Sequence, residues 1–175
     1  MEDKTVIVLA SFSRTGSTFL YNAICGLVNP ELTGISFLDE WCDVDKIKTL
    51  KHLDIVKTHY LRIANIQLTM RACGYNPYFI TIVRNNITFK CDKDILTFKY
   101  EDVLETEEYT LQKIVDYIHD KLEYFLPKEI KLNKKACLNR LIKMNEKVEE
   151  LENEKFEVHD MFFLIHGRHR KRKKQ

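Results

Sequence analysis

The sequence predicts an α/β protein built in three layers, with a parallel sheet of about four strands flanked by helices on both faces. Four short apolar runs, rich in Ile, Val, Leu, Phe and Tyr, lack clean alternation, which is typical of strands covered on both faces. Helical patterns separate or follow these runs, and this alternation implies right-handed crossovers and a parallel sheet. With 175 residues, 45% of them hydrophobic and 31% charged, the chain is long enough for one globular domain with a real core.

Each element has its own signal in the sequence. The apolar runs predict strands at 5–11, 53–58, 78–83 and 95–100. Position and helical spacing predict helices at 17–28, 60–73, 107–125 and 134–152. We expect the first helix to be amphipathic and the second to end near Gly74 and Pro77.

Positive charge is concentrated near the carboxyl end of the sequence. The formal net charge is +2, but six of the 28 Lys and Arg residues lie within 168–174. The other 22 basic residues face 26 acidic ones, so the remainder carries about −4. We therefore expect a single α/β domain over 1–165 and a basic tail over 166–175, with no nucleic-acid partner except through that tail.

Other features indicate the compartment. No apolar run is long enough to span a bilayer, and the start MEDKTVIVLAS lacks the basic segment and cleavage site of a secretory signal. The five cysteines are scattered and odd in number, which is typical of reduced thiols. We expect a cytoplasmic protein, and the sequence does not indicate its oligomeric state.

The most informative segment is TVIVLASFSRTGSTFLYNAI, residues 5–24. It predicts a strand, a small polar turn and a helix, which together direct backbone N–H groups and the positive end of a helix dipole at an anion. The Gly-Lys-Ser/Thr of an NTPase loop is absent, because Ser17 follows Gly16 and the cation, Arg14, precedes it. A phosphate or sulfate site without a metal fits this pattern, and an ordinary capped turn is the alternative. The candidate anion-binding residues are Ser13, Arg14, Thr15, Gly16, Ser17 and Thr18.

Two other predicted strands end in basic residues. Lys57 and His59 follow the run LDIV, and histidine is a candidate base because it exchanges protons near neutral pH. Arg84 follows YFITIV, and a guanidinium suits bidentate binding of phosphate. The alternatives are a surface histidine beside a solvated lysine, and a surface salt bridge. Because ligands of parallel sheets bind beyond the carboxyl ends of the strands, four segments are expected on one rim: Ser13–Thr18, Lys57–His59, Arg84–Asn86 and Tyr100–Asp102.

Together these segments resemble the sulfotransferase family, whose members use 3′-phosphoadenosine 5′-phosphosulfate as donor. SFSRTGSTFL is similar to the family's 5′-phosphosulfate loop, DIVKTHY to its Lys-Thr-His segment with the catalytic base, and ITIVRNN to its 3′-phosphate element. LTFKYEDV resembles the element whose tyrosine lines the adenine site, and HGRHRKRK falls where the family places a basic stretch that also holds the 3′-phosphate. The resemblance implies a P-loop-like sulfotransferase fold, with His59 as base and with Arg84, Tyr100 and Arg168 on the nucleotide.

The expected reaction is transfer of a sulfuryl group to a hydroxyl or an amine. The enzyme then mainly aligns the partners in line and stabilises the charge that spreads in the transition state. Arg14 and Lys57 would stabilise the moving group, and His59 would take the acceptor proton. No metal is expected, because no cluster of metal ligands is evident in the sequence: His166 and His169 have nothing around them to complete a site.

The sequence departs from the family pattern after Arg84. Only 15 residues separate Arg84 from Tyr100, where the family has a long helical insertion, Asn86 stands where proline is usual, and Asp92 replaces a serine. These differences favour one alternative, a non-catalytic nucleotide- or anion-binding relative of the same fold. A small phosphotransferase or kinase is a second alternative, against which the missing Gly-Lys-Ser/Thr counts. The sequence does not identify the acceptor.

Overall fold

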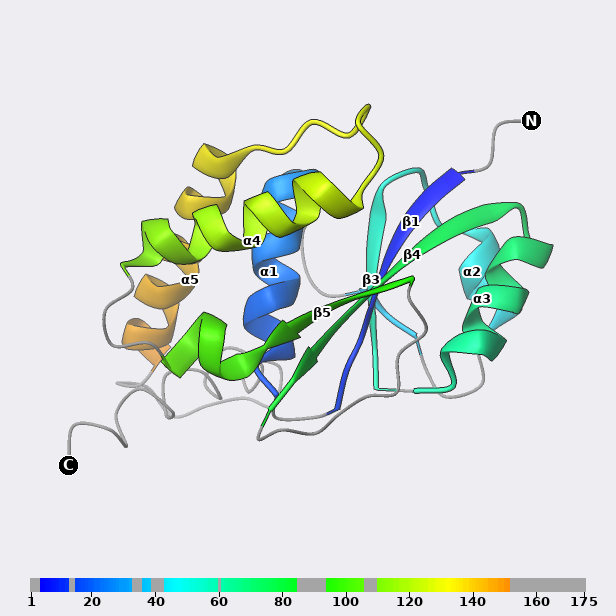
Figure 1. The fold of residues 1–175 in the computed structure, drawn as a ribbon, viewed down its shortest axis with the longest axis horizontal. Helices are drawn as coiled ribbons and strands as arrows, with labels where there is room; N and C mark the ends of the chain where they lie inside the picture. The colour runs from blue at the N-terminus through cyan, green and yellow to red at the C-terminus, as the bar shows by residue number, and fades with distance from the viewer. Residues whose placement is uncertain are drawn as a thin grey trace.

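The chain folds into a sheet between two layers of helices (Figure 1). A computed structural model describes residues 4–12, 15–32, 36–38, 43–59, 61–84, 94–105 and 110–151. The strands are β1 (Lys4–Ala10), β2 (Ser36–Phe37), β3 (Asp54–Thr58), β4 (Tyr75–Val83) and β5 (Ile95–Lys99). The helices are α1 (Ser17–Val28), α2 (Val44–Lys48), α3 (Ile63–Ala72), the π-helical turn η1 (Glu101–Glu105), α4 (Leu111–Phe125) and α5 (Lys134–Leu151). Within these described ranges, no helix has the length and apolar character needed to cross a membrane.

All strand pairs are parallel, and the strand order is β2-β3-β1-β4-β5. The predicted three-layer α/β fold is therefore confirmed, with the four predicted strands in the sheet. The fifth, β2, has only two residues and was missed, because a pair of residues gives no periodic signal. From β1 the chain passes to strands on one side of β1 and then to strands on the other. This reversal makes the carboxyl end of β1 a topological switch point, where parallel sheets bind their ligands.

The two faces of the sheet carry separate hydrophobic cores. Ile7 and Leu9 of β1 belong to the core under α1, α4 and α5, whereas Val6 and Val8 belong to the core under α2 and α3. Successive side chains of a strand point to opposite faces, so each buried strand supplies both cores. Figure 1 shows the same division, with α1, α4 and α5 on one side of the sheet and α2 and α3 on the other.

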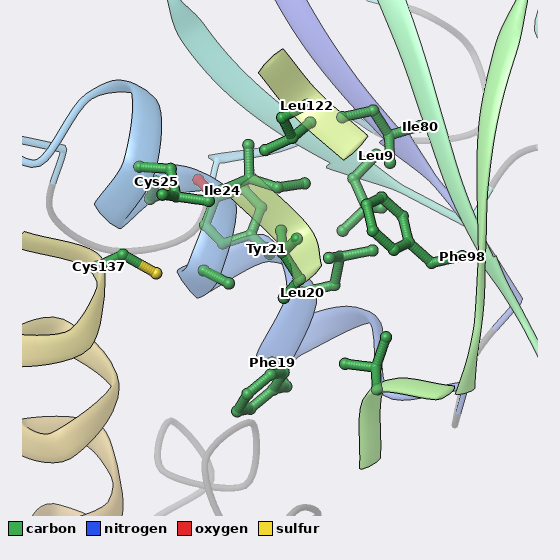
Figure 2. Close-up of a cluster of buried hydrophobic side chains, with 14 of the residues drawn as sticks. Leu9, Phe19, Leu20, Tyr21, Ile24, Cys25, Ile80, Phe98, Leu122 and Cys137 are labelled. Carbon is green, nitrogen blue, oxygen red and sulfur yellow. The ribbon is translucent and has the colours of Figure 1, made fainter. Parts of the chain in front are cut away.

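Helix α1 is buried on all sides, which differs from the predicted amphipathic helix. All 12 of its residues are buried, because the sheet covers one side and α4 and α5 cover the others. Its sequence, STFLYNAICGLV, contains no charged residue. A Cβ placed on Gly26 would lie 2.5 Å from Cys137 Cα, so glycine is what allows α5 to approach so closely. Figure 2 shows the core that α1 forms with the sheet, α4 and α5.

The boundary between α3 and β4 also differs from the prediction. The helix ends at Ala72, Gly74 follows in a left-handed conformation with φ 81°, and β4 begins at once at Tyr75 rather than at residue 78. Pro77 therefore lies inside a strand. It is tolerated because β5 pairs with β4 only from Phe79 onward, so β4 is an edge strand at Pro77 and needs no N–H donor on that side.

Candidate functional site at the carboxyl ends of the strands

The turn between β1 and α1 brings the buried start of the helix to the carboxyl end of β1. Gly16 precedes α1 with φ 80°, a left-handed conformation that glycine adopts without strain. Thr15 Oγ1 donates a hydrogen bond of 2.8 Å to the Phe12 carbonyl and so closes the turn on itself. Within the described first turn of α1 there is no acidic residue that would repel an anion. Two of the predicted residues of this turn, Ser13 and Arg14, lie outside the described residues.

Lys57 lies beneath this helix start. Its side chain is 1% exposed, and its Nζ donates a hydrogen bond of 2.9 Å to Thr18 Oγ1, which joins β3 to the first turn of α1. Burial lowers the pKa of Lys57 to about 8, because the interior disfavours the charged ammonium. The alternative of a solvated surface lysine is therefore wrong. A buried cation is costly, and a bound anion would offset that cost.

His59 follows β3 and is exposed at the rim of the sheet. Its Nδ1 lies 2.7 Å from the main-chain carbonyl oxygen of Ser11. Because a carbonyl can only accept, Nδ1 carries the proton in the neutral ring and the lone pair is on Nε2. The ring is thus held by β1 in the tautomer that a general base requires.

Ser11 is a further candidate site residue, for which the sequence predicted no role. It is fully buried, and its backbone N–H donates to the Thr58 carbonyl at 3.1 Å, which continues the β1–β3 ladder past Ala10. By strand alternation with Leu9, its side chain points to the face that α1 covers. Its hydroxyl has no hydrogen-bond partner within the described part of the chain. A buried polar group without a partner at a strand end indicates a place where a ligand atom can bind.

Arg84 and Tyr100 form a second group on the same rim. The guanidinium carbon of Arg84 lies 4.3 Å from the centroid of the Tyr100 ring, and the tyrosine is 4% exposed. The two residues follow β4 and β5, whereas Lys57 is in β3, two strands from β4. At a strand spacing of about 4.8 Å, the Lys57 and Arg84 positions are roughly 10 Å apart. The rim therefore offers two cationic positions, and the last predicted nucleotide contact, Arg168, lies outside the described residues.

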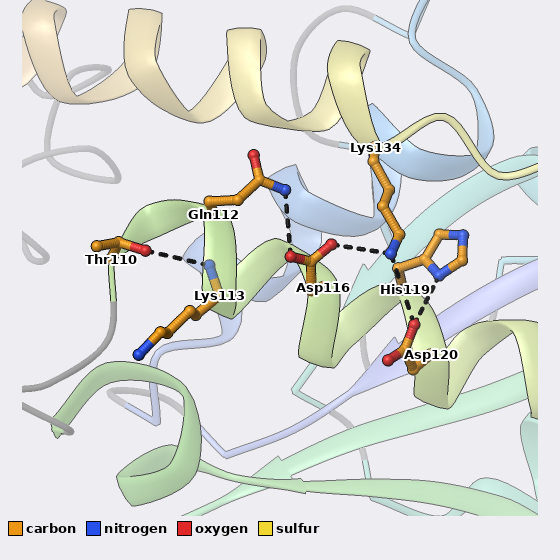
Figure 3. A network of polar contacts seen from close by, with 7 residues as sticks. All are labelled: Thr110, Gln112, Lys113, Asp116, His119, Asp120 and Lys134. Carbon is orange, nitrogen blue, oxygen red and sulfur yellow. Dashed lines mark hydrogen bonds and ion pairs between the residues drawn. The ribbon is translucent and has the colours of Figure 1, made fainter.

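A second polar cluster lies on the surface formed by α4 and the start of α5 (Figure 3). Ligand atoms of His119, Asp120 and Glu123 all lie within 4.8 Å of one another, so the described structure does contain a cluster of potential metal ligands that was not evident in the sequence. Lys134 Nζ, however, lies 2.8 Å from Asp116 and 3.7 Å from Asp120. An ammonium in that position repels a metal ion, and the cluster is adequately explained as a surface ion-pair network.

No protein-family model matches the sequence, and no curated protein matches it either.

Proposed function

We propose that this protein is a sulfotransferase that moves a sulfuryl group from 3′-phosphoadenosine 5′-phosphosulfate to a hydroxyl or amine acceptor. The observation that carries the proposal is the buried Lys57, whose Nζ contacts Thr18 in the first turn of α1 and which His59 follows two residues later. A buried cation, a helix start and a correctly protonated histidine at one switch point suit the transfer of an anionic group. The resemblance of five segments to the sulfotransferase family supports the choice of sulfuryl over phosphoryl transfer.

In this proposal the donor is held at two places. The backbone amides of Thr15 to Thr18, with the Ser17 and Thr18 hydroxyls, bind the 5′-phosphosulfate at the helix start. Arg84 binds the 3′-phosphate through its guanidinium while it stacks on Tyr100. The spacing of these two positions suits a nucleotide with anionic groups at both its 3′ and its 5′ ends. The predicted contributions of Ser13, Arg14 and Arg168 remain predictions from the sequence.

The chemical step breaks the S–O bond to the donor phosphate and forms an S–O bond to a hydroxyl acceptor or an S–N bond to an amine acceptor. The acceptor oxygen or nitrogen attacks sulfur as the bond from sulfur to the phosphate oxygen breaks, and the proton of the acceptor passes to His59 Nε2. The leaving group is 3′-phosphoadenosine 5′-phosphate, and the charge that grows on its bridging oxygen is stabilised by the Lys57 ammonium. The sulfuryl group needs only alignment and charge stabilisation, which are what a helix start and fixed cations supply.

Thermal shift tests the donor site. We expect 3′-phosphoadenosine 5′-phosphate to raise the melting temperature more than AMP does, because a ligand that binds only the folded state stabilises it. An equal shift with both nucleotides would falsify recognition of the 3′-phosphate. Transfer of radiolabelled sulfate from the donor to a panel of hydroxyl and amine acceptors then tests catalysis. Binding without transfer to any acceptor would favour the non-catalytic nucleotide-binding alternative.

A further inference from the structure

A chain of polar contacts, buried at Lys57, Thr18 and Asn22 and partly buried at Arg140, connects the proposed anion site with α5. Lys57 Nζ donates to Thr18 Oγ1 at 2.9 Å, and the Thr18 main-chain carbonyl accepts a hydrogen bond of 2.9 Å from Asn22 Nδ2. Asn22 Oδ1 in turn accepts a hydrogen bond of 3.2 Å from Arg140 Nε. Asn22 is 4% exposed and Thr18 is 6% exposed, so the chain runs through the interior. It links residues that are 118 positions apart in sequence.

Arg140 and the Thr18 carbonyl together determine which way the Asn22 amide points. A guanidinium has donors only, so the Asn22 oxygen must face Arg140 and the NH₂ group must face Thr18. With the opposite orientation, two donors would meet at Arg140 and two acceptors would meet at Thr18. Arg140 and the Thr18 carbonyl therefore require the same orientation of the Asn22 amide, which can bridge α5 and the first turn of α1.

Arg140 is itself fixed in place. Its Nη1 donates a hydrogen bond of 2.6 Å to the Leu32 carbonyl, which follows α1, so the guanidinium is held at two points. Both acceptors are neutral oxygens and do not cancel its charge. The charge reaches the interior of α1: burial raises the pKa of Cys25 to about 11, and the Arg140 charge opposes that rise.

We propose that Arg140, acting through the Asn22 side chain, is a positioning residue that holds the first turn of α1 where Thr18 and Lys57 can bind an oxyanion. This inference rests on the proposed anion site. It assigns a role in ligand binding to a helix that contributes no residue to the rim. The arrangement differs from a long-range charge effect, because here the influence of Arg140 passes through one amide.

A mutant cycle in ligand binding separates an influence of Arg140 that passes through the Asn22 amide from a long-range charge effect. The variants are Arg140→Met, Asn22→Leu and the double variant, with Lys143→Met as the control because it removes an exposed positive charge from the same helix. The probes are inorganic sulfate and 3′-phosphoadenosine 5′-phosphate, titrated by calorimetry into protein that circular dichroism shows to be folded. Arg140→Lys is included because it keeps the charge and one donor to Asn22.

We expect Arg140→Met and Asn22→Leu each to lower the affinity for both probes about tenfold. The double variant should bind both probes no more weakly than either single variant does. Lys143→Met should bind like wild type, and Arg140→Lys should recover most of the affinity. The loss of affinity above pH 8, which reports Lys57, should shift its midpoint in Arg140→Met but not in Lys143→Met.

Two results would overturn this inference and leave the proposed anion site standing. One is unchanged affinity in folded Arg140→Met. The other is a double variant in which the two losses of affinity add, as a pure charge effect would give. A lower melting temperature with normal affinity would make Arg140 a structural residue and would also overturn it. Wild-type protein that binds neither probe would instead remove the anion site and this inference together.

Discussion

The rim of the sheet and the α4–α5 surface contain the same pair of residue types in opposite settings. At the rim, Lys57 is buried with a hydroxyl as its partner, and His59 is held by a main-chain carbonyl. On the α4–α5 surface, the Lys134 side chain is 40% exposed between two carboxylates, and His119 Nδ1 lies 3.0 Å from Asp120.

The two lysines therefore lie in different environments: Lys134 is paired with carboxylates at the surface, whereas Lys57 is buried and donates to a hydroxyl. The hydrogen bond to Asp116 raises the pKa of Lys134, whereas burial lowers the pKa of Lys57 to about 8. An exposed ion pair of this kind contributes little to stability, because solvent screens it. Burial of a lysine costs stability, and perturbed groups of this kind are common at functional sites.

Removing each histidine is the strongest test of this contrast. If His59 is the base, His59→Ala should lower the transfer rate 10²- to 10⁴-fold, on the order of 3–5 kcal/mol of barrier, and barely change donor affinity. His119→Ala should leave both unchanged. Single-turnover transfer across pH 5 to 9 measures the effect, and His59→Ala should lose the acidic limb of the profile. Similar rates in the two variants would remove His59 from catalysis, and a parallel loss of nucleotide binding would make it a donor-contacting residue.

Replacing the two lysines tests whether Lys57 lowers folding stability and Lys134 does not. Between pH 8 and 10.5 the unfolded chain keeps a proton on residue 57 that the folded protein has lost, so folding stability gains from Lys57 as pH rises. Lys57→Met should therefore be more stable than wild type at pH 7, by as much as about 3 kcal/mol. This difference in the free energy of unfolding should disappear toward pH 10.5. Lys134→Met should be slightly less stable than wild type.

Denaturant unfolding at several pH values measures both lysine variants. Burial raises the pKa of Cys25 to about 11 and that of Cys137 to about 12, which lowers stability at alkaline pH in all of these proteins. The difference between variant and wild type removes that shared contribution. A Lys57→Met protein that is no more stable at pH 7 would contradict the account of Lys57 as a cation that burial destabilises.

Arg84 provides a third test, with a cation on α4 as its control. Arg84→Ala should weaken the binding of 3′-phosphoadenosine 5′-phosphate by roughly 1.5–3 kcal/mol, because a charge-assisted hydrogen bond is lost. The circular dichroism spectrum should not change. Lys121 makes a comparable contact, with its Nζ 5.4 Å from the Phe98 ring centroid, so Lys121→Ala removes a cation from an aromatic ring without touching the rim. Equal affinities in the two variants, measured by calorimetry, would return Arg84 to the surface salt-bridge alternative.

The smallest expected effect concerns two buried hydroxyls. Ser11 and Thr81 both lack a hydrogen-bond partner in the described residues, but strand alternation places Thr81 on the face away from α1. Ser11→Ala should weaken sulfate binding by about 0.5–1.5 kcal/mol, whereas Thr81→Val should not change it. Neither should lower the melting temperature much, since each removes an unsatisfied group. Sulfate affinity that is the same in Ser11→Ala as in wild type would exclude this hydroxyl from the site.

The sequence predicted the sheet well because buried parallel strands leave long apolar runs such as TVIVLA. It also predicted which strand ends share a rim, since parallel strands all end on the same side. It did not predict that α1 is fully buried, because the cover that α5 provides is a contact between distant segments. Ser11 and Asn22 were missed for a similar reason: a serine at a strand end and an asparagine in a helix gain meaning only from neighbours that tertiary structure brings to them.

The close approach at Gly26 bears on which substitutions the chain can accept over evolution. Gly26 lies one turn after Asn22 on α1, and Cys137 lies one turn before Arg140 on α5, so the two contacts are adjacent along the same pair of helices. A side chain at position 26 would push α5 away from α1 and so increase the distance between Arg140 and Asn22. Selection on the ligand site would then keep position 26 a glycine even though it never meets a ligand, and an exchange to alanine there would need a matching change on α5 to survive.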